Sequence, residues 1–240
     1  MNTLPSLIWK DVPKLTSSQM QQVIMQATGK YGIDARLIVE HAGRNLAELA
    51  HRFAPDGPVL VVAGRGNNGS GGLAAARLLA GHGRQVWVVP THEAENYSGP
   101  PKEQLELLKN FSNVRVKTSI PKMKFSCAID AGIGTRLEGP PRGRTLDAIT
   151  VMNNSGAVVI AVDTPTGVIA DTGEVPGDAV KATMTMSLAL PKKGVKPGEH
   201  TGDLYIGDVG VPAGVYTDMG ITPPKLPYFL VKVEESKGKK

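Results

Sequence analysis

The stretch VLVVAGRGNNGSGGLAAARLLAGHGRQVWVV, residues 59–89, decides the fold. Its first five residues form a short apolar run, which is typical of a strand buried on both faces of a parallel sheet. A glycine-rich segment follows, and then LAAARLLAGHG predicts a helix that ends at Gly81 or Gly83. Because VWVV predicts a second strand, the stretch indicates one strand–helix–strand unit of a parallel sheet.

Two helices are expected upstream of this unit. The segment TSSQ at residues 16–19 has the pattern of a capping box, in which the side chains of Thr16 and Gln19 each bond the other residue's backbone N–H. A helix should therefore follow Thr16 and stop at Gly29. A second helix is predicted from Asp34, a good N-cap residue, to about Phe53.

Strands and helices continue to alternate downstream. Helices are predicted around residues 101–110 and 144–154, and strands in NVRV (113–116), CAID (127–130), AVVIAVD (157–163), TMTMSLAL (183–190) and DLYIGDVG (203–210). This alternation predicts an α/β fold, a Rossmann-like three-layer α/β/α sandwich with a mostly parallel sheet. We expect one domain over residues 1–221. Residues 222–240 are interpreted as a docked extension that ends in a disordered basic tail.

The composition fits one domain and restricts the partners. With 240 residues, 41% of them apolar, the chain can bury a sizeable core, and the single cysteine, Cys127, is expected to pack inside it. The net charge is +5, but three lysines lie in the last five residues and aromatic residues are only 5%, which argues against a nucleic-acid binder. Neither a membrane span nor a signal peptide is indicated. We expect a soluble, cytoplasmic protein that binds an anionic small molecule.

The glycine-rich segment is the first candidate site. Gly64, Gly66 and Gly69 match the pattern G-x-G-x-x-G between a strand and a helix, where free backbone amides favour a phosphate. The alternative is a tight turn that holds no ligand. An NAD dehydrogenase would also place an acidic residue near the end of the next strand, but the nearest one, Glu93, comes late. The segment therefore predicts a nucleotide-type ligand and disfavours an ordinary NAD dehydrogenase.

Several separated motifs resemble one known family, that of the NAD(P)H-hydrate epimerases (YjeF N-terminal domain). The segment GNNGSGG is similar to the family's GNNGGDG, and AVDTPTGVIADTG is similar to its VD-I-P-S-G-x-x-x-DTG. Further matches are DAGIGTRLEGP (130–140), LALPKKG (188–194) with GDLYIGDVGVP (202–212), and HAGRNLAELA (41–50). The resemblance covers about residues 15–212, with the motifs in order.

This resemblance implies a function. Members of the family bind the hydrated nicotinamide nucleotides NADHX and NADPHX and interconvert their R and S epimers, which is a repair reaction. The partners to expect are a small nucleotide ligand of this kind and a second copy of the chain as a homodimer. No nucleic acid and no membrane partner is expected.

The resemblance also implies site residues. The substrate would contact two segments and one aspartate: Asn67, Asn68, Gly69, Ser70 and Gly71; Gly134, Thr135, Arg136, Leu137, Glu138, Gly139 and Pro140; and Asp163. A potassium ion would be bound by Asn68, Asp130 and Thr166, whose oxygen atoms suit a hard cation. Since the segments of this set follow predicted strands, we expect them to converge at one edge of the sheet.

Asp163 and Lys192 are the candidate catalytic residues. Epimerisation requires proton movement, and Asp163 ends an apolar strand at the edge where α/β proteins bind ligands. Alternatively, Asp163 caps the turn at Pro165. Lys192 could contact a phosphate or donate a proton, or could be an ordinary solvated lysine. Asp130 in turn could simply begin the loop that follows it.

One position departs from the family pattern. The aspartate of the family's GGDG is replaced by Gly71, so a carboxylate is absent. Three interpretations follow: an active epimerase, a member that binds nucleotides with little or no turnover, and, least favoured, a nicotinamide-dependent oxidoreductase. Because an acid/base group typically contributes about 10² to 10⁴ in rate, the missing carboxylate predicts binding with little turnover.

Overall fold

The computed structural model describes residues 4–223 and 225–235 and has a nine-stranded sheet at its centre. Six parallel strands carry the main unit: β2 (Val59–Ala63), β3 (Val86–Pro90), β4 (Val114–Val116), β5 (Cys127–Ala131), β6 (Val158–Val162) and β7 (Met184–Leu188). Their spatial order, β4-β3-β2-β5-β6-β7, is the 3-2-1-4-5-6 order of a Rossmann fold. The predicted Rossmann-like α/β fold is confirmed.

Three further strands extend the sheet at one side. β8 (Asp203–Gly207) pairs parallel with β7, β9 (Leu230–Glu234) pairs antiparallel with β8, and β1 (Ser6–Ile8) pairs parallel with β9. No pattern in the sequence predicts β1 or β9. The expected extension after Thr222 thus contributes a strand to the sheet itself, and the expected disordered tail falls on residues 236–240, which lie outside the described residues.

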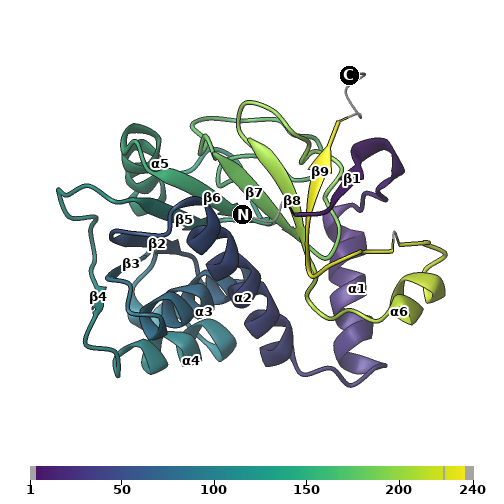
Figure 1. Cartoon of the computed structure of the whole chain (residues 1–240), viewed down its shortest axis with the longest axis horizontal. Helices are drawn as coiled ribbons and strands as arrows, with labels where there is room; N and C mark the ends of the chain where they lie inside the picture. The colour runs from purple at the N-terminus through teal and green to yellow at the C-terminus, as the bar shows by residue number, and fades with distance from the viewer. Residues whose placement is uncertain (1–3, 224, 236–240) are drawn as a thin grey trace.

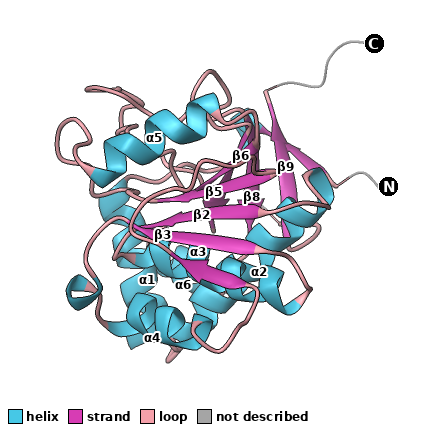
Figure 2. Ribbon diagram, turned by 90° about the vertical axis from the view of Figure 1, so that its left-hand side faces the viewer, coloured by secondary structure: helices cyan, strands magenta, loops and turns pink. Residues whose placement is uncertain are grey.

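The helices cover both faces of the sheet (Figures 1 and 2). On one face, α2 (Ala35–Phe53) and α3 (Asn67–Gly81) pack in the largest hydrophobic cluster, and α4 (Gly99–Leu108) packs against α3. On the other face, α5 (Arg144–Asn154) forms a second cluster. The helices α1 (Ser17–Gly29) and α6 (Ala213–Asp218) lie side by side and share a third cluster with β8 (Figure 1). Two short 3-10 turns complete the elements, η1 (Trp9–Asp11) and η2 (Ala94–Asn96).

The predicted starts of α1 and α2 agree with the structure. Thr16 and Gln19 form the expected capping box at the start of α1, and the Asp34 carboxylate accepts a hydrogen bond from the backbone N–H of Arg36 at the start of α2.

No helix in residues 4–223 and 225–235 is long and apolar enough to cross a membrane.

α3 begins earlier than the sequence predicted. The prediction placed its start near Leu73, but the helix begins at Asn67, so most of the glycine-rich segment is helical. Close packing explains the glycines: a Cβ atom at Gly69 would lie 1.8 Å from the Gly64 carbonyl oxygen, and one at Gly72 would lie 2.4 Å from the Ala131 Cβ. Low helix propensity is therefore overridden by tight packing of α3 against β2 and β5.

Candidate functional site

The order of the strands reverses between β2 and β5, and α/β proteins bind ligands at such a switch point. The backbone N–H of Gly64, just after β2, donates a hydrogen bond to the Ala131 carbonyl at the end of β5, over 2.8 Å. α3 begins beside this contact, and its N-cap, Gly66, makes no side-chain capping bond. The amides of the first turn of α3 are therefore available to an anion at the edge of the sheet.

The predicted contact residues at the start of α3 differ in how far they are exposed to solvent. Asn67 is exposed and Asn68 is half-buried. Ser70 is buried, and its hydroxyl donates to the Gly66 carbonyl 3.2 Å away, within the helix. A Cβ atom at Gly71 would point toward α2 and lie 3.3 Å from the Ala42 Cβ. Asn67 and Asn68 are thus suited to meet a ligand, whereas substrate contact by Ser70 and Gly71 stays a prediction.

Asn68 joins the ends of three neighbouring strands. Its side-chain Nδ2 donates to the Val162 carbonyl at the end of β6, over 2.7 Å. Gly134, in the loop after β5, lies against the same amide group, because a Cβ atom there would be 2.2 Å from the Asn68 Nδ2. These contacts bring Asn68, Gly134 and the start of the Asp163 loop together, as expected from their positions after strands.

Asp130, in β5, and Thr166, in the loop after β6, form a buried pair. The Thr166 hydroxyl donates to one Asp130 carboxylate oxygen over 2.6 Å, and the Thr166 backbone N–H donates to the other over 2.7 Å. The Gly132 backbone N–H adds a third bond of 3.3 Å. Burial raises the pKa of the Asp130 carboxyl, and the bonds from Thr166 and Gly132 oppose part of that rise. Asp130 therefore bonds Gly132, the first residue of the loop after β5, as the alternative interpretation expects. It also forms a buried polar pair with Thr166.

No cationic side chain within the described residues forms an ion pair with Asp130. A buried carboxylate of this kind is costly when it is charged, and a bound cation would remove that cost. Among the described residues, no three His, Cys, Asp or Glu side chains lie together as a metal-binding group. The oxygen that contacts the Asp130 carboxylate is the Thr166 hydroxyl, which also lies 3.3 Å from the Ile133 carbonyl oxygen. Hydroxyl, carboxylate and carbonyl oxygens suit a hard monovalent cation.

Asp163 and Lys192 form a buried ion pair. The Lys192 Nζ donates to the Asp163 Oδ1, with 0% of the lysine side chain and 6% of the aspartate side chain exposed. The same oxygen accepts the Leu188 backbone N–H over 3.0 Å. Lys192 is therefore not the solvated lysine of the alternative reading, and Asp163 bonds the loop after β7, not the turn at Pro165.

The backbone at Asp163 adopts a conformation that favours glycine, with φ of 66°. A non-glycine residue in this region stores strain of order 1 kcal/mol and is common at functional sites. Oδ1 of Asp163 is occupied by its two partners, whereas no described residue donates to Oδ2. Asp163 thus offers one carboxylate oxygen to a ligand at the sheet edge.

The contacts that hold Lys192 in place are not visible in the sequence. Leu15, before α1, forms a β-bridge with Lys192: its N–H donates to the Pro191 carbonyl over 2.9 Å, and the Lys193 N–H donates to its carbonyl over 3.0 Å. One carboxylate oxygen of Asp171 accepts from the Ser17 N–H and hydroxyl, over 2.6 and 2.9 Å. These pairs are more than 150 residues apart in the chain, so no local pattern could reveal them.

The second predicted contact segment, residues 134–140, is a loop on the surface. All of its residues are half-buried or exposed, and no hydrogen bond within the described residues involves Thr135, Arg136, Leu137, Glu138 or Gly139. A Cβ atom at Gly177 would lie 2.8 Å from the Pro140 Cβ, so Pro140 packs at the far end of the loop. The backbone groups of 135–139 are available to a ligand that lies over the β5 end.

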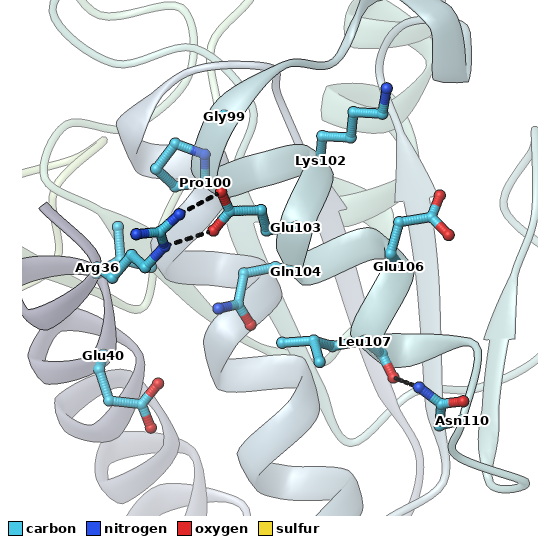
Figure 3. Close-up of a pocket in the computed structure, with 11 residues that line it drawn as sticks. Arg36, Glu40, Gly99, Pro100, Lys102, Glu103, Gln104, Glu106, Leu107 and Asn110 are labelled. Atoms are coloured by element: carbon cyan, nitrogen blue, oxygen red, sulfur yellow. Dashed lines mark hydrogen bonds and ion pairs between the residues drawn. The ribbon is translucent and has the colours of Figure 1, made fainter.

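A hollow of about 740 Å³ lies elsewhere, between the start of α2 and α4 (Figure 3). None of its lining residues is a predicted site residue. Arg36 and Glu103 bind each other across it through two hydrogen bonds of 2.8 and 2.9 Å. Its lining comes from α2, α4 and Asn110 and includes no residue at the carboxyl end of a strand. We therefore place the functional site at the β2–β5 switch point.

Known proteins are similar to this chain over most of its length. The family model described as "YjeF-related protein N-terminus" matches residues 36–194, which include the glycine-rich segment, Asp130, Asp163 and Lys192. A protein of Truepera radiovictrix named NAD(P)H-hydrate epimerase is 58% identical over 87% of this chain and 95% of its own length. One of the same name from Dehalogenimonas lykanthroporepellens is 35% identical over 94% of each chain.

The crystal structure of the yeast protein YNL200c has the same fold. It superposes with a TM-score of 0.77 at 22% sequence identity, over 92% of this chain and 100% of the yeast chain. The arrangement of the strands and the matches in sequence lead to one conclusion. The chain belongs to the family of YjeF-related protein N-termini.

Proposed function

We propose that this protein is an NAD(P)H-hydrate epimerase, which interconverts the R and S epimers of NADHX and NADPHX. The observation that carries the proposal is the buried Asp163–Lys192 pair, whose aspartate lies directly after β6 at the sheet edge. Asn68, in the first turn of α3, bonds the carbonyl of the residue just before Asp163. A carboxylate suited to proton transfer near a helix start suited to phosphate supports the proposal, as do the similar proteins named NAD(P)H-hydrate epimerase, which match most of this chain.

Each part of the site has a role in this proposal. The amides at the start of α3 bind the phosphates, and Asn67, Asn68 and the loop 134–140 contact the rest of the nucleotide. Inverting one carbon requires a bond at that carbon to break and to form again on the opposite face, with movement of a proton. The free Oδ2 of Asp163 would take and return this proton, while the Lys192 Nζ binds Oδ1 and holds the carboxylate in place.

We further propose that potassium binds at Asp130, Thr166 and Asn68. The buried Asp130 carboxylate with no cationic partner among the described residues is what supports this assignment. A bound monovalent cation would supply positive charge near the substrate and would order the ends of β2, β5 and β6. The Thr166 hydroxyl, the Asp130 carboxylate and the Asn68 amide oxygen would provide its protein ligands.

The proposed activity is tested with purified protein and R-NADHX, with the epimers separated by chromatography. The wild type should bring the two epimers to equilibrium faster than buffer alone, and Asp163→Asn should lose most of this acceleration, about 10²-fold or more. Asp147→Asn is the matched control, because Asp147 is exposed on α5. A wild type that binds R-NADHX without accelerating its epimerisation would exclude the proposal and leave a nucleotide-binding protein.

The partners and location belong to the same proposal. A small nucleotide is the expected ligand, and the cytoplasm, where such nucleotides are used, is the expected compartment. A homodimer is a further expectation, which sedimentation of the full chain would test.

A further inference from the structure

Three side chains that the proposed function does not use belong to segments that meet at the carboxyl end of β3. Arg65 is two residues beyond β2, and His92 is two residues beyond the neighbouring strand β3. Arg144, the first residue of α5, forms an ion pair with Glu93, the residue after His92. Partial burial lowers the pKa of His92, and the charges of Arg65 and Arg144 lower it further. Three separate segments of the chain therefore place positive charge or a hydrogen-bond donor around one point.

The loop that carries His92 is held firmly. The Thr91 backbone N–H and the buried Tyr97 hydroxyl both donate to the Ala63 carbonyl at the end of β2, over 3.0 and 2.7 Å. The Thr91 hydroxyl lies 2.8 Å from the His92 Nδ1. When Thr91 donates to Nδ1, the neutral imidazole carries its hydrogen on Nε2 and can donate it to an anion.

The position of this cluster at the end of β3 indicates which anion it would bind. In a Rossmann fold the pyrophosphate lies at the helix start after the first strand, and the adenosine ribose lies at the end of the next strand, which here is β3. An acidic residue there binds the ribose 2′-hydroxyl, whereas an arginine accommodates a 2′-phosphate. The nearest acid, Glu93, comes three residues after β3 and forms an ion pair with Arg144, with 61% of its side chain exposed. The cluster keeps an excess of positive charge even after this pairing.

We infer that Arg65, His92 and Arg144 form a binding site for the 2′-phosphate of the substrate, so that the protein favours NADPHX over NADHX. This inference rests on the proposed function for the identity of the substrate, but the phosphate site itself does not require turnover. Arg65 and Arg144 would bind the phosphate oxygens by charge-assisted hydrogen bonds, and His92 would donate from Nε2. Glu93 competes for Arg144 and limits the preference.

Binding of adenosine phosphates tests the site independently of epimerisation. Calorimetry at fixed ionic strength should show that adenosine 2′,5′-bisphosphate binds more tightly than adenosine 5′-phosphate. It should also bind more tightly than adenosine 3′,5′-bisphosphate, which has the same charge. Arg65→Ala and Arg144→Ala should each weaken binding of the 2′,5′-bisphosphate by about 10- to 100-fold and leave binding of the 5′-phosphate nearly unchanged.

Two further variants provide a control and an expected gain in affinity. Arg142→Ala removes an exposed arginine two residues from Arg144 and should leave the discrimination intact. Glu93→Gln releases Arg144 and should strengthen binding of the 2′,5′-bisphosphate by about two- to fivefold, a change that a purely structural role for the Glu93–Arg144 pair would not produce.

Three results would overturn the inference. They are equal binding of all three nucleotides by the wild type, a loss of affinity in the Arg142 variant as large as in the Arg65 and Arg144 variants, and a loss in these two variants that is the same for every nucleotide. The last result would assign the cluster to the pyrophosphate. Selective binding of the 2′,5′-bisphosphate in a protein that does not epimerise NADPHX would reject the proposed function but retain the phosphate site.

Discussion

The Lys192 Nζ donates a hydrogen bond to the Asp163 Oδ1, and this ion pair is almost completely excluded from water. Lys192 also lies 3.3 and 3.4 Å from the carbonyl oxygens of Leu190 and Leu188, so the ammonium group is surrounded by acceptors. A buried charge pair of this kind is tolerated only when its remaining hydrogen bonds are satisfied. The pair therefore ties the loop after β7 to the aspartate that we propose as the acid/base.

The first prediction concerns the stability of this pair. Lys192→Met and Asp163→Asn should each lower the free energy of unfolding by about 3–5 kcal/mol, because each leaves the partner charge buried and unpaired. The double variant should be more stable than the sum of the two single losses implies, since neither charge remains. Urea unfolding of the four proteins measures this coupling. Additive losses would show that the two side chains do not interact energetically.

The second prediction concerns potassium. At a concentration about ten times its dissociation constant, potassium should stabilise the wild type by about 1.4 kcal/mol relative to tetramethylammonium, or roughly 3 to 6 °C in melting temperature. Asp130→Asn should abolish this difference, because it removes the carboxylate of the proposed cation site. Asp147→Asn, on the exposed face of α5, should retain it. Equal melting temperatures of the wild type in the two salts would exclude a potassium site here.

Local patterns were enough to predict the central fold and the strand ends. The apolar runs of β2 and β5, the capping box at Thr16 and the N-cap at Asp34 each act within a few residues, so they could be read from the sequence. Asp130 and Asp163 could be placed at the ligand edge for the same reason: each lies at the carboxyl end of an apolar run.

Contacts between distant segments could not be predicted in this way. β1 has three residues and lies beside β9 only because both complete the sheet at its edge. The start of α3 was predicted too late, since glycines usually disfavour a helix and their packing against Gly64 and Ala131 was not visible. Likewise, the sequence alone does not decide whether Lys192 is a solvated or a functional residue, because its partner Asp163 is 29 residues away.

The third prediction concerns Cys127, which is buried in β5. Burial raises the pKa of its thiol to about 12, from an ordinary value of 9.0. The folded protein therefore retains the proton that the unfolded chain loses above pH 9, so stability should fall as the pH rises from 9 toward 12, by up to about 1.4 kcal/mol per pH unit from this group.

Urea unfolding at pH 8, 9 and 10 checks this third prediction, with Cys127→Ala as the comparison. The variant should lose less stability over this range than the wild type, and iodoacetamide at pH 8 should modify the wild type only once it is unfolded. Rapid modification of the native protein would show that the thiol is accessible.

The last prediction concerns Gly71, where the family pattern has an aspartate. From the sequence alone the missing carboxylate predicts little turnover, so restoring it should raise epimerase activity. The packing around Gly71 predicts a loss of stability instead. A Cβ atom at Gly71 would lie 3.3 Å from the Ala42 Cβ and 3.9 Å from the Leu46 Cδ1, so the added side chain would enter the contact between α3 and α2. Gly71→Asp should therefore lower the free energy of unfolding by about 1–3 kcal/mol, the usual cost of overpacking, with a further cost for a buried charge.

Gly71→Ala is the matched control for Gly71→Asp, because it adds the Cβ atom without the carboxylate. It should cost less stability than the aspartate, since alanine favours the helix and only the 3.3 Å contact with Ala42 must relax. If Gly71 is a packing position, R-NADHX epimerisation by the folded fraction of both variants should not exceed that of the wild type. If Gly71→Asp instead folds stably and accelerates epimerisation about 10²-fold over both the wild type and Gly71→Ala, the missing carboxylate is catalytic and the wild type is a binding protein with little turnover.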